Sequence, residues 1–102
     1  MLGSLIGREE LEAEIRKATG LLARRPGVQR VWLFGSAAQG RRLDWRSDLD
    51  FAVEGLPETE LSQAWCELDE ALKLPVDLVR WESASATLRR QIAKRGRVLH
   101  EA

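Results

Sequence analysis

The sequence predicts an α/β (α+β) protein built on a small mixed β-sheet with helices packed against it. Apolar residues recur at helical spacing over residues 8–24 and 58–73. Short apolar runs at 28–34, 48–54 and 76–81 are typical of strands. A third helix and a short last strand complete the predicted order, which is helix, strand, strand, helix, strand, helix, strand.

The first helix has a single apolar stripe and a clear end. The stripe is made of Leu11, Ile15, Ala18 and Leu22. Pro26 and Gly27 break the helix, and the strand that follows is apolar at each of its last four positions. We therefore expect this strand to be covered on both faces. A short helical turn is expected at 36–39, with Ser36 as N-cap and Gly40 closing it.

The second strand alternates between apolar and acidic positions. Leu49, Phe51 and Val53 are expected to face one way, and Asp48, Asp50 and Ala52 the other. A loop joins this strand to the first, so the two are predicted to be antiparallel.

The helix over 58–73 is predicted to bury Leu61, Trp65, Leu68 and Leu72. The strand at 76–81 follows this helical crossover and is expected to lie parallel to the second strand. Ser83 is a candidate N-cap for a helix over 84–95, which Gly96 stops, and 97–100 forms a short last strand.

The bulk composition narrows the class of protein. The 102 residues predict one domain, 1–102, and sixteen basic residues balance sixteen acidic ones. This balance gives no electrostatic reason to expect direct nucleic-acid binding. One cysteine, no signal peptide and no apolar run of membrane-spanning length lead us to expect a cytoplasmic protein without membrane contact.

The residues with the clearest chemistry are a Gly-Ser pair and two nearby aspartates. Gly35 permits a sharp turn or a close ligand approach, and Ser36 adds a hydroxyl and a backbone N–H. Asp48 and Asp50 project from the same side of one strand because they are two residues apart. Adjacent carboxylates repel unless a proton, a basic partner or a divalent cation intervenes. The pattern therefore predicts phosphoryl or nucleotidyl transfer.

A third carboxylate, Asp77, stands in an otherwise apolar strand. If this strand pairs beside the one carrying Asp48 and Asp50, Asp77 joins their face as a cross-strand neighbour. Three such carboxylates suit two Mg²⁺ ions, because Mg²⁺ prefers a few carboxylates together with water and substrate phosphates. Singly, however, Asp48 is also typical of a turn, and Asp77 of an ion pair with a nearby arginine.

The segments Phe34-Gly35-Ser36, Asp48-Leu49-Asp50 and Val76-Asp77-Leu78-Val79 together resemble the signature of the nucleotidyltransferase superfamily related to DNA polymerase β. The small size resembles its minimal, or MNT, group. One departure is the eleven residues between Ser36 and Asp48, where ten are commoner, which places an extra residue in the basic loop at 41–46. That loop is either a triphosphate contact or simply a solvated surface.

The resemblance implies a role for each matched residue. Gly35 and Ser36 would contact the phosphates of a nucleoside triphosphate, expected to be ATP. Asp48, Asp50 and Asp77 would be the catalytic and metal-binding residues, with Asp77 also helping to activate an acceptor hydroxyl. The implied reaction transfers the NMP unit and releases pyrophosphate.

The resemblance also implies a partner. The chain ends soon after the expected catalytic core, so we expect a second chain to present the acceptor. In the MNT group this partner is a helical HEPN-type toxin, and the MNT member is an antitoxin that can AMPylate it. The alternative is a catalytically weak nucleotide-binding module that neutralises or regulates a helical partner by forming a complex.

Overall fold

Four strands and three helices make up the computed structural model, which describes residues 5–102. The elements, in chain order, are α1 (Arg8–Ala23), β1 (Arg30–Phe34), β2 (Leu49–Glu54), α2 (Leu61–Ala71), β3 (Val76–Arg80), α3 (Ala86–Arg95) and β4 (Arg97–Glu101). The strands form one sheet in the order β3-β2-β1-β4. The predicted order of elements and the small mixed sheet are therefore confirmed.

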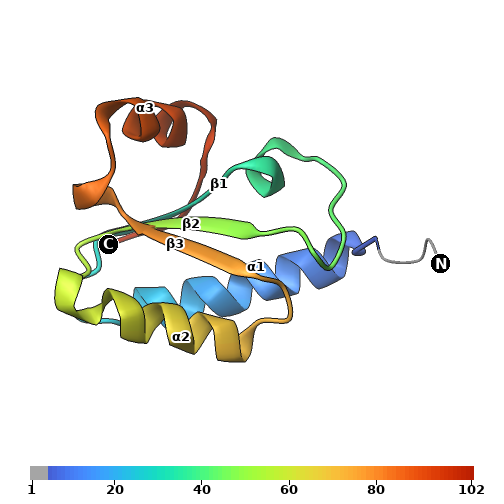
Figure 1. Ribbon diagram of the computed structural model, residues 1–102, viewed down its shortest axis with the longest axis horizontal. Helices are drawn as coiled ribbons and strands as arrows, with labels where there is room; N and C mark the ends of the chain where they lie inside the picture. Colours follow the sequence, from blue (N-terminus) through green and yellow to red (C-terminus); the bar gives the residue numbers. More distant parts are fainter. Residues whose placement is uncertain (1–4) are drawn as a thin grey trace.

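Helices cover both faces of this sheet, in unequal numbers. Figure 1 shows α1 and α2 side by side on one face and α3 alone on the other. The larger apolar core lies under α1 and α2 and includes Ile15, Leu49 and Phe51. The smaller core, on the α3 side, is built on Trp32, Ala52 and Ile92. Ala52 points away from the larger core, but it is still buried because α3 covers its face of the sheet.

The strand directions agree with the prediction and bring distant residues together. β1 and β2 are antiparallel, with Phe34 opposite Asp50. β2 and β3 are parallel, with Asp50 beside Asp77. The helical crossover through α2 accounts for the parallel pairing. It carries the chain back to the end of the sheet where β2 begins, so β3 runs in the same direction as β2. Asp77 is thereby a cross-strand neighbour of Asp50, as the sequence predicted.

Two helix boundaries differ from those expected. The stretch predicted as one helix over 58–73 begins with a 3₁₀ turn, and α2 ends at Ala71 because Leu72 is already extended toward β3. The N-cap of α3 is Ser85, whose hydroxyl accepts from the Leu88 N–H at 3.1 Å. Ser83 was the expected cap, but its hydroxyl accepts instead from the Arg80 guanidinium at 2.8 Å.

None of the helices described within residues 5–102 is both long enough and apolar enough to cross a membrane.

Candidate active site

The turn after β1 depends on a glycine. Gly35 has φ 75°, in the left-handed region, and leads into the 3₁₀ turn Ser36–Gln39 that Gly40 closes. The expected helical turn is thus present, with Gly35 rather than Ser36 in the capping position. A Cβ on Gly35 would collide with the carboxylate of Asp50. The glycine therefore allows the turn to lie directly against an acidic side chain of β2.

Asp50 and Asp77 lie next to each other on the α3 side of the sheet. Their flanking residues Leu49 and Leu78 are buried, and Leu49 belongs to the core under α1 and α2. Alternation along each strand consequently turns the two aspartates to the opposite face. Both carboxylates are half-buried at the end of the sheet where the Gly35 turn lies.

The environment of Asp50 is unfavourable for a negative charge. Burial is the largest cause, followed by the nearby charges of Asp77 and Asp48, and together they raise the pKa of Asp50 to about 6. At neutral pH the ionised Asp50 carboxylate therefore lies near two like charges. Within residues 5–102 it forms no salt bridge to a cationic side chain. A positive ligand would relieve this repulsion.

Asp48 lies outside the strand, immediately before β2, and is exposed. It lines an open pocket of about 500 Å³, which we call the loop pocket. The other lining residues include Ser36, Asp50, Arg41, Arg42 and Arg46. The basic loop thus faces the same space as the Gly-Ser turn and two of the predicted acids.

The loop has a defined internal structure that the sequence did not reveal. Asp44 Oδ1 accepts from the Arg46 N–H at 2.9 Å and from the Ser47 hydroxyl at 3.2 Å. Within the loop, the Leu43 carbonyl accepts from the Ile6 N–H at 2.9 Å. These bonds fix the approach to Asp48.

The donor set fits a divalent metal by its chemistry. Carboxylates on neighbouring strands with excess negative charge are ligands suited to Mg²⁺. Within residues 5–102, however, no three His, Cys, Asp or Glu side chains already converge as a ready metal cage. The register brings together Asp50 and Asp77, while Asp48 stands at the rim.

A residue that the sequence reading missed holds the start of β3 in place. Glu14, buried in α1, accepts from the backbone N–H groups of Lys73 at 2.6 Å and Leu74 at 3.3 Å. These residues precede β3, so Glu14 anchors the segment leading to Asp77. The available signal was an acid beside Ile15 in the apolar stripe of α1.

Comparison with known proteins places this chain in a family. The Polymerase beta, Nucleotidyltransferase family matches residues 16–102. Over 80 residues, the chain is 38% identical to Protein adenylyltransferase MntA of Shewanella oneidensis, covering 72% of this chain and 55% of that protein. The matched part of the chain thus spans about half the length of this relative.

Two solved structures share the fold. One is the complex of tri-AMPylated Shewanella oneidensis HEPN toxin with MNT antitoxin, with 29% identity, TM-score 0.71, and coverage of 89% of this chain and 72% of that chain. The other is a toxin–antitoxin structure with AMP-PNP, with 29% identity, TM-score 0.68, and coverage of 95% and 75%. From its match over residues 16–102, the chain belongs to the polymerase β nucleotidyltransferase family.

Proposed function

We propose that this protein is a metal-dependent nucleotidyltransferase that transfers AMP from ATP to a hydroxyl group on a partner protein. The observation that carries the proposal is the pairing of Asp50 with Asp77 beside the Gly35 turn. Family membership and the similarity to a protein adenylyltransferase support the same reaction class. The proposal covers the residues of this chain, 1–102, as one catalytic domain.

Each site residue has a task that follows from its position. Gly35 and Ser36 present a close backbone approach and a hydroxyl to the donor phosphates. Asp77, on the neighbouring strand, accepts the proton of the acceptor hydroxyl. The acceptor oxygen forms a bond to the α-phosphorus as the bond from that phosphorus to the β-phosphate bridging oxygen breaks, and pyrophosphate leaves. Catalysis of this kind depends mainly on positioning and charge stabilisation.

Asp48, Asp50 and Asp77 are the residues that would hold Mg²⁺, in a site for two ions. When bound, the metal supplies positive charge that stabilises the attacking and leaving oxygens. Arg41, Arg42 and Arg46 line the loop pocket with Asp48 and Asp50 and add positive charge there, which suits the leaving pyrophosphate.

We further propose that the partner is a helical HEPN-type protein and that the chain acts as the antitoxin of the pair. The support is the similarity to an MNT antitoxin solved in complex with a tri-AMPylated HEPN toxin. Nucleotide use is supported by the likeness to a toxin–antitoxin structure containing AMP-PNP.

The test combines the purified chain, its neighbour-encoded helical protein, Mg²⁺ and ATP labelled on the α-phosphate. We expect label on the partner, and a loss of roughly 100-fold or more for Asp48→Asn and Asp50→Asn. Asp69→Asn is the control, because this exposed aspartate lies on α2 across the sheet. No transfer by the wild type, or equal transfer by all variants, contradicts the proposal. A tight complex without transfer identifies the protein as a binding module instead.

A further inference from the structure

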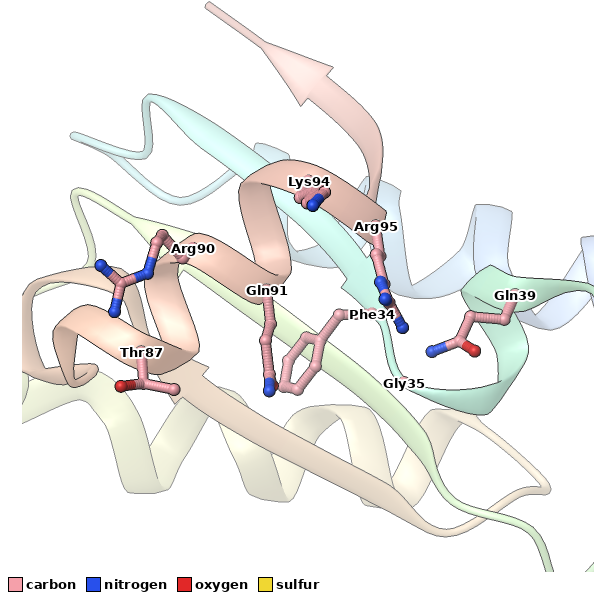
Figure 2. Close-up of a pocket in the computed structure, with 8 residues that line it drawn as sticks. All are labelled: Phe34, Gly35, Gln39, Thr87, Arg90, Gln91, Lys94 and Arg95. Carbon is pink, nitrogen blue, oxygen red and sulfur yellow. The ribbon is translucent and has the colours of Figure 1, made fainter.

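A second pocket adjoins the Gly35 turn. It has a volume of about 560 Å³ and lies between α3 and the end of β1 (Figure 2). We call it the α3 pocket. Gly35 lines this pocket, and Ser36 lines the loop pocket, so the two spaces meet at the Gly-Ser turn.

One end of the α3 pocket is suited to a phosphate group. Figure 2 shows the Arg95 guanidinium reaching from the end of α3 toward Gly35 and Gln39. Among residues 5–102, Arg95 has no recorded ion pair or side-chain hydrogen bond, and neither does Lys94, which also lines the pocket. No carboxylate stands among the described lining residues. A guanidinium beside backbone and amide groups is a good match for phosphate oxygens.

Two arginines close to the pocket in sequence, in contrast to Arg95, are held by partners within the fold. Arg89 donates to the carbonyls of Trp81 at 2.9 Å and Glu82 at 3.1 Å, and it lies over the Trp81 ring. Arg97 forms a two-bond ion pair with Glu12 at 2.9 and 3.0 Å. These two guanidinium groups hold the fold together, whereas the pocket-lining cations remain available to a ligand.

The middle of the pocket is suited to a nucleobase. In Figure 2 the Phe34 ring lies between the Arg95 end and the Arg90 end, and Gln91 points from α3 into the same pocket. An aromatic face can stack on a base, and a carboxamide offers one donor group and one acceptor for a base edge. Phe34 is also the register partner of Asp50, so a base over Phe34 lies next to the acids.

We infer that the α3 pocket binds an AMP unit, with its phosphate near Arg95, its base on the Phe34 ring and the base edge toward Gln91. This inference rests on the proposed function and specifies a site for it. The AMP unit has two chemical sources, the nucleoside half of the ATP donor or an AMP group already attached to the acceptor. The second source would account for repeated transfer, such as the three AMP groups on the HEPN toxin in the similar complex.

The first experiment measures binding without activity. Titration calorimetry with AMP is performed on the full chain in EDTA, so that the result does not depend on the metal site. We expect binding by the wild type, weakened about tenfold or more in Arg95→Gln and also weakened in Gln91→Ala. Arg16→Gln removes the same charge from an exposed site on α1 and should bind AMP as the wild type does. Failure of the wild type to bind AMP, or equal affinity in all variants, overturns the inference.

The second experiment separates the two sources by counting AMP units on the partner with mass spectrometry. If the pocket holds the donor, Arg95→Gln weakens ATP affinity and slows the first transfer. If it holds an attached AMP, Arg95→Gln leaves the first transfer intact and stops the later ones. Either result supports the inference, and a normal series of transfers by both pocket variants contradicts it. If the wild type binds AMP but has no transferase activity, the proposed function is refuted and the inference about the α3 pocket still stands.

Discussion

The Asp50 carboxylate occupies the space that a Cβ on Gly35 would need. This contact joins the turn after β1 to the acidic strand β2, and it makes a side chain at position 35 incompatible with the present position of Asp50. The glycine is also required by its positive φ of 75°. Both constraints act at the same residue.

Gly35→Ala is therefore expected to lower the free energy of unfolding by about 1–3 kcal/mol and to displace Asp50. Chemical denaturation measures the first effect. Gly20→Ala is the control, because Gly20 lies inside α1 and a Cβ there meets open space. This variant should raise the free energy of unfolding by up to about 1 kcal/mol. Equal stability of Gly35→Ala and the wild type would show that the turn does not depend on the glycine.

Asp50→Asn should stabilise the protein at neutral pH. Because the folded-state pKa of Asp50 is raised to about 6 from its ordinary 3.8, the ionised carboxylate destabilises the fold above pH 6. The penalty fades as the pH falls and is absent below about 4, where the carboxyl is protonated in both states. We expect a gain of about 1 kcal/mol at pH 7.5, after allowance for solvent screening of this half-exposed group.

Thermal melts between pH 4 and 8 test this expectation, with Asp69→Asn as the exposed control. The melting temperature of Asp50→Asn should exceed that of the wild type by about 4–8 °C at pH 7.5 and converge with it near pH 4. A difference that is constant across this range would exclude titration of Asp50 as its cause.

Mg²⁺ should raise the melting temperature of the wild type without nucleotide, because a ligand that binds only the folded state stabilises it. At a free concentration 100 times the dissociation constant, this gain is about 2.7 kcal/mol. Asp50→Asn should lose most of the response, since one carboxylate and its repulsion with Asp77 are gone. The same melts with EDTA provide the baseline. An equal Mg²⁺ response in both proteins would place the ion elsewhere.

Glu14→Ala should cost about 2–3 kcal/mol of stability. The substitution leaves the N–H groups of Lys73 and Leu74 without their buried charged acceptor. Urea denaturation gives the loss, and Glu70→Ala, an exposed change on α2, should stay within about 0.5 kcal/mol of the wild type. A loss for Glu14→Ala no larger than that of the control would mean that water replaces the carboxylate.

Trp81→Ala should destabilise the α3 layer. Trp81 stacks on Trp32 of β1, with ring centroids 4.6 Å apart and an interplanar angle of 21°. Loss of this ring should cost about 3 kcal/mol, whereas Trp81→Phe keeps a stacking partner and should cost about 1 kcal/mol. Near-ultraviolet circular dichroism follows the stack directly, and denaturation gives the energies. Similar losses for the two variants would show that stacking contributes little.

Much of this fold was predictable because its signals are local. The apolar stripe of α1, the alternation at 48–54 and the helix between the second and third strands determine which elements form and how they pair. The adjacency of Asp50 and Asp77 follows from those pairings. The prediction of Ser83 as the cap was wrong because the Ser83 hydroxyl is held by Arg80, a contact that the sequence does not give.

The α3 pocket was not predictable in the same way. Gln91 and Arg95 belong to a helix for which the sequence predicts only its bounds, and their position in one pocket with Phe34 depends on how α3 packs over the sheet. The stacking of Trp81 on Trp32 was missed for the same reason. Contacts between separate layers depend on packing distances, and no sequence spacing records those.

The unequal apolar cores on the two sheet faces have a consequence for motion. α1 and α2 are anchored by an extensive core, whereas α3 rests on a small cluster around Trp32, Ala52 and Ile92. Local opening should therefore require less free energy for α3 than for α1, so amide hydrogen exchange should be faster in residues 86–95. The layer that lines the α3 pocket is thus the one that can lift while the rest of the protein stays folded, and a ligand bridging Arg95 and the Gly35 turn would slow that exchange.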